Sequence, residues 1–563
     1  MSQCTQPTSD LGSIRFGVLL SSEMAEAWQV ECIRHLVNRG AVVALIILDA
    51  TPAEAVPLSQ RLRHYDWSRL LFNLFYRYKF KPKTKKLLSV ETVMQGARVM
   101  HCRPITKGVG NFFSSGDVEA IRDADLHFLL RFGFGILRGE VLDAARHGVW
   151  SFHHGDEQFY RGSPPGLWEI YKGDPVTGVI LQRITDRLDD GEVLYKGWFR
   201  TINRSWSDHL DQLQWGSVDW PARCAAALKN GVLNPVAALS RAPVFKPPRN
   251  FAFICLLLKM MINRLRFHLG ELFRAEDWNI AIAPSGNSLR PCINSIWQWF
   301  PKPEKNVFVA DPFIVTVRGV DYVWFEEYNC RKERGRISAV RVAEVDRYPQ
   351  SRSVLLEEPW HLSFPSVTEH EGELFCTPES FAARQIRLYR LQLPDMKLVL
   401  DTVLIDNLPG VDPVLWFERS RWWLFCTTKD APSIHLYLFF ADDLRGPYYP
   451  HPLNPVKSDL RSSRPAGNLF MLNGKLYRPA QDCSVHYGRK VVINEVEVLS
   501  TIDYREKSIE QILPVDKNRF YEGIHTYNFN TLNKVVDGKR FVFILAVFKL
   551  KFTEHFKRFF QHV

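Results

Sequence analysis

Residues 148–196 read GVWSFHHGDEQFYRGSPPGLWEIYKGDPVTGVILQRITDRLDDGEVLYK and contain the polar cluster from which we predict the fold and the site. The apolar run 149–152 predicts a strand, and His153 and His154 follow at its carboxyl end. Catalytic groups in open α/β sheets gather at such strand ends. A histidine there and an acidic residue from 186–192 predict either a general acid/base pair or a structural His–Asp contact.

The residues before this stretch predict the scaffold around it. Apolar runs typical of strands alternate with helical patterns, and Gly40 ends the first helix. The predicted order is strand 14–22, helix 25–40, strand 41–50, strand 126–136 and helix 137–148. This alternation predicts an α/β, Rossmann-like domain, which we expect over residues 12–205.

Residues 206–276 are expected to form a helical and linking region. Within it, 236–250 is rich in Pro and basic residues, which is typical of a linker. Residues 251–274 begin apolar and turn amphipathic after Lys259, too soon for a span of the bilayer. They predict an interfacial membrane helix or a helix that docks the two halves together. The aromatic and basic segment 67–86 predicts a membrane-surface or partner-binding helix, or a packed helix before a solvated loop.

From residue 277 the pattern changes to short aromatic and β-branched runs, separated by Gly, Pro, Asn and Asp turns. The runs recur at intervals of about fifty residues, and five such units can be counted. A recurring β unit of this kind predicts an all-β, five-bladed propeller, which we expect over residues 277–555.

Length and composition limit the class of protein. A chain of 563 residues is too long for one core, so two or three domains are expected. The net charge of +11 favours phosphorylated small molecules as partners, and without a nucleic-acid motif no nucleic acid is expected. The ten cysteines are scattered singly, which predicts no metal site and a reducing compartment. We expect a cytoplasmic protein, with peripheral contact at the inner membrane surface as an open alternative.

Four motifs of the first domain resemble the N10-formyltetrahydrofolate-dependent formyltransferases, a family that includes methionyl-tRNA and sugar N-formyltransferases. The family pattern is Asn-x-His, a loop with Arg-Gly, then Gly-x-x-x-Thr-Gly-Val and Leu-Asp-x-Gly. The matching segments here are Ser151-Phe-His153, Tyr160-Arg-Gly162, Gly173-Asp-Pro-Val-Thr-Gly-Val179 and Leu188-Asp-Asp-Gly191. The resemblance covers roughly residues 14–205 and implies formyl transfer from N10-formyltetrahydrofolate, as co-substrate, to an amine.

The resemblance also implies roles for individual residues. His153 would stabilise the tetrahedral oxyanion and assist proton transfer, and Asp189 would orient His153 and help to remove the amine proton. The residues expected to bind the folate are Arg131, Phe132, Gly133, Gly135, Ile136 and Leu188. Those expected to bind the acceptor in this domain are His154, Arg161 and Gly162.

The chain departs from the family at Ser151, which stands where the family has its catalytic Asn. A hydroxyl is shorter than an amide, so it would need a water molecule or a shifted oxyanion. Losing one oxyanion donor typically costs about 10² to 10³ in rate. Formyl transfer is therefore expected to be retained in slowed form, rescued by His154, or lost.

The second half resembles the five-bladed propellers of glycoside hydrolases such as arabinanases, and also the N-terminal domain of plant glucosamine inositolphosphorylceramide transferases. Asp311 fits the position of a catalytic base, whereas Asp412 stands where a general-acid Glu would be expected. Glu326, Glu327, Glu379 or Glu522 could substitute for that acid. We expect glycan binding rather than hydrolysis, with Asp311, Glu326 and Asp412 in contact with the sugar. Each Asp-Pro pair equally predicts a turn that closes a blade.

Together, these observations predict an enzyme of glycan biosynthesis that N-formylates an amino sugar, free, nucleotide-linked or lipid-linked, and whose propeller holds the sugar. A glycoside hydrolase that cleaves glycans through Asp311 without folate is the first alternative. A non-catalytic glycan-binding protein with a degenerate formyltransferase domain is the second.

Overall fold

The computed structural model describes residues 10–52, 65–94, 96–186, 191–238, 242–285, 296–545, 547–549 and 551–553. These residues fall into two compact units that divide between Leu265 and Arg266. We call them the N-terminal unit and the C-terminal unit and describe each by itself.

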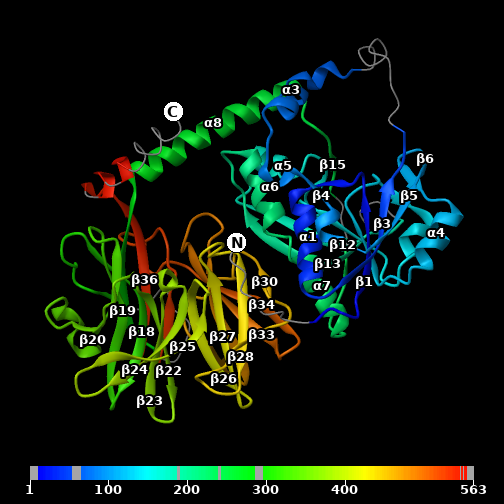
Figure 1. Ribbon diagram of the computed structural model, residues 1–563. Coiled ribbons are helices and arrows are strands. Elements are labelled where there is room, and N and C mark those ends of the chain that lie inside the picture. Colours follow the sequence, from blue (N-terminus) through cyan, green and yellow to red (C-terminus); the bar gives the residue numbers. More distant parts are fainter. Residues whose placement is uncertain are drawn as a thin grey trace. The chain divides into compact units, whose positions relative to one another are not determined.

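The N-terminal unit is built on an eight-stranded sheet with the order β14-β13-β12-β10-β8-β1-β3-β5 (Figure 1). The five strands from β10 to β5 are parallel, and β12, β13 and β14 continue the sheet in antiparallel fashion. The strands are β1 Arg15–Leu20, β3 Val42–Asp49, β5 Arg98–Cys102, β8 Phe128–Arg131, β10 Val149–His153, β12 Val176–Arg183, β13 Glu192–Arg200 and β14 Val236–Ala237. The predicted α/β sheet is thus present, with a mixed edge.

Helices cover both faces of this sheet. On one face, Trp28 of α1 and Trp220 of α7 pack against Phe152 of β10. On the other, Val118 and Ile121 of α4 join the core cluster of β1 and β3. The helices are α1 Ala27–Asn38, α3 Leu70–Tyr78, α4 Ser115–Arg122, α5 Leu167–Lys172, α6 Trp206–Trp215 and α7 Trp220–Lys229. Both faces of the central strands are therefore buried, which explains their nearly continuous apolar sequences.

Small sheets of two or three strands are also present in the N-terminal unit. They are β2 Met24–Glu26 with β4 Leu87–Ser89, β11 Arg161–Gly162 with β15 Val244–Phe245, and β6 Ile105–Lys107 with β7 Gly110–Phe112 and β9 Leu137–Arg138. The helix predicted over 137–148 is wrong, because β9 is followed there by one 3₁₀ segment, Gly139–Asp143. Gly139 at φ 76° begins this segment and Gly148 at φ 69° closes the stretch, so neither end has helical backbone.

The described residues of the C-terminal unit form five separate antiparallel sheets (Figure 1). Four of them are built from consecutive strands: β18 Val307–Val317 to β21 Ser353–Leu356, β22 Ser363–His370 to β25 Lys397–Asp406, β26 Gly410–Glu418 to β30 Lys457–Ser458, and β31 Phe470–Leu472 to β34 Tyr504–Ile512. The strands that lie between these first and last strands in the sequence are β19 Val320–Asn329, β20 Arg334–Arg341, β23 Glu373–Glu379, β24 Gln385–Gln392, β27 Arg421–Thr428, β28 His435–Ala441, β29 Tyr449–Pro450, β32 Lys475–Asp482 and β33 Lys490–Leu499. Neighbouring sheets share apolar cores, as where Phe375 and Ile386 pack with Leu415 and Trp422.

The fifth sheet joins the two ends of the C-terminal unit. It combines β16 Ala275–Pro284 and β17 Gln298–Trp299 with β35 Tyr527–Phe529 and β36 Asn533–Val542. β16 and β36 pair over their whole length, from Ala275 opposite Val542 to Pro284 opposite Asn533. The last strand of the unit therefore completes the sheet that the first strand begins.

The first strands of three sheets share one backbone irregularity. The strand register shifts at Asp311, Phe364 and Asp412, and each of these residues is left-handed, with φ of 51°, 46° and 49°. Left-handed backbone is unfavourable for residues other than glycine. Its recurrence at the same position in the first strand of three sheets therefore indicates that one common feature of the fold imposes it.

Helix α8, Asn250–Phe273, contains the boundary between the two units. Its first turns pack on the N-terminal unit through Phe253 and Leu256. No helix among the described residues is both long enough and apolar enough to cross a bilayer.

Candidate functional site

The candidate site of the N-terminal unit lies at the carboxyl end of β10, between β8 and β12. Ser151 and His153 are two residues apart and therefore share one face of the strand. Ser151 is opposite Arg131 in the register of β8 and opposite Gln182 in that of β12. The sheet thus brings the predicted folate residue Arg131 beside the Ser151 that replaces the family's Asn.

Ser151 is buried, and its hydroxyl has a charged partner. Arg131 donates from Nη1 to Ser151 Oγ at 2.9 Å and, from Nη2, to the carbonyl of Gly135. Arg131 Nε is enclosed without a hydrogen-bond partner among the described residues, and burial lowers the pKa of this guanidinium. A half-buried cationic donor is therefore present at the position where the family offers an amide N–H.

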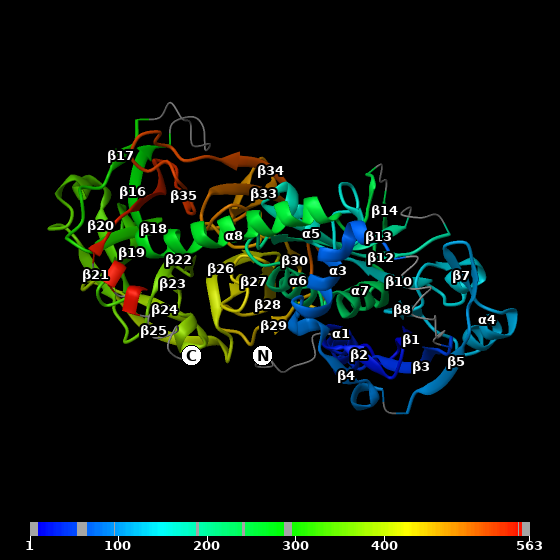
Figure 2. The ribbon, with the colours of Figure 1, turned by 90° about the horizontal axis from the view of Figure 1, so that it is seen from above.

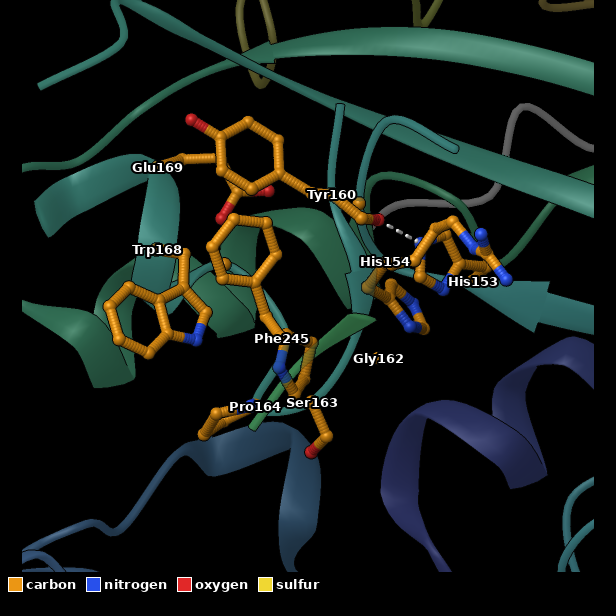
Figure 3. A pocket seen from close by; sticks show the side chains of 13 residues that line it. His153, His154, Tyr160, Gly162, Ser163, Pro164, Trp168, Glu169 and Phe245 are labelled. Carbon is orange, nitrogen blue, oxygen red and sulfur yellow. Dashed lines mark hydrogen bonds between the residues drawn. The ribbon is translucent and has the colours of Figure 1, made fainter. Parts of the chain in front are cut away.

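His153 and His154 point to different surroundings. His153 Nε2 lies 2.7 Å from the carbonyl oxygen of Tyr160 and faces a cavity (Figure 3). His154 packs edge-on against Trp28 and stacks on Phe152, and its enclosed Nε2 has no partner among the described residues. Burial, with a smaller contribution from His153, lowers the pKa of His154 to about 3. His154 therefore stays neutral at physiological pH.

Four of the other residues predicted to bind the folate follow the end of β8 and are described by the structure. Phe132 packs on Trp28, Gly133 has no room for a side chain because its Cβ would lie 2.7 Å from Ser21 N, and Ile136 is exposed. Gly135 has a left-handed φ of 58°. The predicted Leu188 and Asp189 lie outside the described residues, between β12 and β13.

A small, half-open pocket, which we call the cavity, lies beside His153. Its lining comes from the loop after β10, the turn that holds β11, helix α5 and the end of β15 (Figure 3). The residues are His153, His154, Gly155, Tyr160, Arg161, Gly162, Ser163, Pro164, Pro165, Gly166, Trp168, Glu169 and Phe245. Arg161 and Gly162, both expected from the sequence, are among them, and Arg161 Nη1 donates to the carbonyl of Ala242 at 3.1 Å.

Glu169 is the acidic residue of this cavity, and the sequence did not single it out. Only 2% of it is exposed, and its Oε1 has no hydrogen-bond partner in the described part of the chain. Burial raises the pKa of Glu169 to about 7. Trp168, Tyr160 and Phe245 surround it with rings, and Lys172 Nζ lies 4.6 Å from the centre of the Tyr160 ring. The site therefore offers a carboxyl group that can exchange a proton near neutral pH.

The predicted residues Asp311, Glu326 and Asp412 of the C-terminal unit are all buried in a network of charged side chains. Asp311 accepts from Thr526 Oγ1 at 2.8 Å and from the backbone N–H of Phe364 at 3.1 Å. His525 contacts Asp311 at 3.1 Å with Nε2 and Asp537 at 2.7 Å with Nδ1. Burial alone would raise the pKa of Asp311, but the charge and hydrogen bond of His525 lower it.

Asp412 belongs to a second group in this network. Arg464 Nε donates to Asp412 Oδ2 at 2.5 Å, and Glu379 lies 3.7 Å from the same guanidinium. Glu379 also accepts from the backbone N–H of Asp412 at 3.3 Å. Burial raises the pKa of Glu379, and the charge of Asp412 adds to the effect. The left-handed Asp311, Phe364 and Asp412 thus each direct a backbone N–H at a buried carboxylate.

Glu326 lies beside these two groups, and burial, reinforced by Asp311, raises its pKa well above that of a free glutamate. Its Oε1 is 3.8 Å from Nε2 of His361. The sequence did not single out Arg464, His525 or Asp537. Arg464 precedes Pro465 as Asp311 precedes Pro312, so the recurring residue before proline was the available signal.

One group of the described residues has the chemistry of a metal site, namely Asp311, His525 and Asp537. Both imidazole nitrogens of His525 already face a carboxylate oxygen, at 3.1 and 2.7 Å. The two carboxylates raise the pKa of His525 against the effect of burial, so the group forms an ion-paired triad.

Known proteins are similar to the two halves of this chain separately. Residues 275–543 match the family model described as glucosamine inositolphosphorylceramide transferase 1, N-terminal. The glucosamine inositolphosphorylceramide transferase 1 of Oryza sativa subsp. japonica is 31% identical over 242 residues, 42% of this chain and 32% of that protein. The chain thus spans about a third of the length of this curated relative.

The first half is similar to a different group of proteins. A methionyl-tRNA formyltransferase of Nitratidesulfovibrio vulgaris is 36% identical over 115 residues, 20% of this chain and 32% of that protein. The chain thus joins a formyltransferase-like segment to one that is similar to the plant transferase domain.

Among solved structures, a thermostable family-43 glycoside hydrolase matches with a TM-score of 0.30 and 12% identity, over 36% of this chain and 76% of its own.

Proposed function

We propose that the N-terminal unit transfers a formyl group from N10-formyltetrahydrofolate to the amine of an amino sugar, and that the C-terminal unit binds the sugar. The observation that carries the proposal is the placement of Ser151, Arg131 and His153 at one strand end, next to the cavity that holds Glu169. The similarity of the first half to methionyl-tRNA formyltransferase supports the same reaction class.

The residues fit the folate co-substrate in two respects. Arg131 Nε is enclosed and unpaired within the described residues, so it can donate to an oxygen of the formyl group or the pterin. Because Gly133 has no side chain, the loop after β8 can lie close to the backbone of Ser21. The co-substrate would supply the formyl carbon, and Arg131 to Ile136 would hold it against β10.

In the proposed reaction the amine nitrogen bonds to the formyl carbon, the carbon–N10 bond breaks, and tetrahydrofolate leaves. His153 assists the transfer to N10 of the proton that the amine loses as the amide forms. Arg131 and Ser151 form the donor pair for the oxyanion in place of the family's amide. Glu169, whose pKa burial raises to about 7, accepts the proton that the ammonium group loses before attack. The aromatic walls of Trp168 and Phe245 exclude water from that transfer.

For the C-terminal unit, we propose that the five sheets are the blades of a five-bladed propeller whose buried charged network lies next to the sugar site. Each blade would contribute its first strand to the centre. The left-handed Asp311, Phe364 and Asp412, each in the first strand of a sheet and each directing a backbone N–H at a buried carboxylate, support this arrangement. The end-to-end pairing of β16 with β36 supports closure of such a ring.

The test is formylation by purified full-length protein of free, nucleotide-linked and lipid-linked amino sugars in the presence of N10-formyltetrahydrofolate, followed by mass spectrometry. We expect formylation of one class, lost in His153→Ala and retained in the exposed control Glu371→Gln. Folate binding by calorimetry without formylation of any amine would contradict the proposed reaction.

A second candidate function, glycoside hydrolysis by the C-terminal unit, is favoured by one observation. Asp311 has a lowered pKa and Glu326 a raised one, the pairing of base and acid that glycosidases use. This alternative predicts sugar release without folate that is lost in Asp311→Asn, whereas the formyl-transfer proposal predicts no sugar release at all.

A further inference from the structure

Helix α8 has apolar side chains on two sides, and among the described residues one of these sides is packed and the other is exposed. Phe253 and Leu256 are buried against Phe72 and Trp206. A second row of large apolar residues follows the helix at spacings of three and four and is exposed. This row consists of Phe251, Ile254, Leu258, Met261, Ile262 and Leu265, all within the N-terminal unit.

Helix α3 repeats the pattern next to α8. Phe72 is buried, whereas Leu71, Leu74 and Tyr78, again three and four residues apart, are exposed, and Trp67 in the preceding turn is 58% exposed. Figures 1 and 2 both show α3 beside the first turns of α8. We call the exposed apolar side chains of the two helices, with Trp67, the α3/α8 surface.

Hydrogen bonds fix the two rows to each other. Asn250, next to the exposed Phe251, accepts from Leu71 N at 3.0 Å and donates to the carbonyl of Trp67 at 2.9 Å. Arg69 Nε donates to the carbonyl of Pro247 at 2.9 Å. The α3/α8 surface is therefore one firmly held patch, because its two halves share backbone contacts.

The segments that carry this surface are strongly basic. Residues 67–90 contain seven Lys or Arg and no Asp or Glu, and residues 242–265 contain four Lys or Arg and no acid. Exposed members are Arg77, Lys79, Lys81, Lys83, Lys86, Lys246, Arg249 and Arg264. A second copy of the same surface would bring these like charges together, so self-association through this patch is disfavoured.

We infer that the α3/α8 surface binds the surface of an anionic lipid bilayer. Exposed aliphatic and aromatic side chains on a helix that lies flat enter the boundary between headgroups and acyl chains. Lysine and arginine side chains beside them attract anionic headgroups. The inference does not depend on the proposed reaction, and it would give that reaction access to a lipid-linked acceptor.

The experiment is flotation of the purified full-length protein with phosphatidylcholine vesicles, with and without phosphatidylserine. We expect binding to the anionic vesicles that weakens when salt rises from about 0.1 M to about 1 M, because screening shortens the reach of the charges. The variant Leu258→Glu/Met261→Glu should lower the partition coefficient by at least about tenfold, because two apolar anchors are lost and two like charges added.

The matched control is Leu513→Glu/Leu532→Glu, which changes two exposed apolar residues of the C-terminal unit. It should bind vesicles as the unchanged protein does, and circular dichroism should show that all variants are folded. Equal binding to neutral and anionic vesicles, or unchanged binding of Leu258→Glu/Met261→Glu, would overturn the inference. So would light scattering that shows a dimer which this variant dissociates, because a second copy would then cover the surface.

Discussion

Replacing Glu169 by Gln tests whether the cavity holds this carboxyl group in its neutral form. Glu169 is 2% exposed, and burial raises its pKa from 4.5 to about 7. This rise in pKa corresponds to a free-energy difference of about 3 kcal/mol between the two protonation states. Because the folded state retains the proton more strongly than the unfolded one, this group lowers the free energy of unfolding as pH rises from about 4.5 through 7.

Glu169→Gln removes the titration, so the melting temperature of the variant relative to the unchanged protein should rise between pH 5 and pH 8. The measurement is differential scanning fluorimetry at matched ionic strength, with the exposed Glu371→Gln as control. In the formylation assay, Glu169→Gln should lower kcat/KM most above pH 7. There Glu169 is ionised and can accept a proton, whereas the amide of the variant cannot. A difference in melting temperature that is constant from pH 5 to pH 8 would refute the assignment of a buried, neutral carboxyl group.

Three further substitutions test other parts of the structure. Arg131→Gln removes the donor to Ser151 and should lower kcat by about 10² to 10³, with a smaller change in KM for the amine, measured by steady-state formylation. Gly162→Ala would place a Cβ 2.3 Å from the carbonyl of Phe245 at a φ of 90°, so it should destabilise the N-terminal unit and speed hydrogen exchange at β15; an unchanged exchange rate would contradict this. Arg464→Met leaves Asp412 buried without its cation and should cost about 3–5 kcal/mol, seen as a lower melting temperature, whereas the added change Asp412→Asn should recover part of the loss.

The first strands and the first helix could be predicted because their apolar periodicity is local. The predicted order strand 14–22, helix 25–40 and strand 41–50 is confirmed as β1, α1 and β3. The failure at 137–148 shows that periodicity alone is not sufficient. Leu137, Val141 and Ala145 have helical spacing, but they pack on the sheet core from β9, a 3₁₀ segment and the residues that follow it.

The shared face of Ser151 and His153 follows from the two-residue repeat of a strand, so the sequence is sufficient to predict it. The cavity could not be predicted in the same way. Phe245 reaches it only because β15 pairs with β11, more than eighty residues earlier in the chain. Glu169 belongs to a short helix whose pattern does not show that its carboxyl group is enclosed.

The network in the C-terminal unit shows the same limit. Asp311 and Asp412 stand out because each precedes a proline in a recurring phrase. Their partners His525 and Arg464 come from the segments that precede β35 and β31, 214 and 52 residues away, and no local pattern connects such positions.

The pairing of β16 with β36 has a consequence for the time course of synthesis. Ala275 meets its partner Val542 only after roughly 270 further residues have been made. At about 5–20 residues per second, the strand that starts the C-terminal unit waits on the order of a quarter of a minute or more before its neighbour leaves the ribosome. During that interval β16 presents an unpaired edge with the alternating apolar residues Ile280 and Ile282, a target for chaperones and for strands of other nascent chains. The N-terminal unit has by then emerged completely and can fold first, so a ribosome-bound intermediate should carry a finished α/β unit followed by an open β-rich chain.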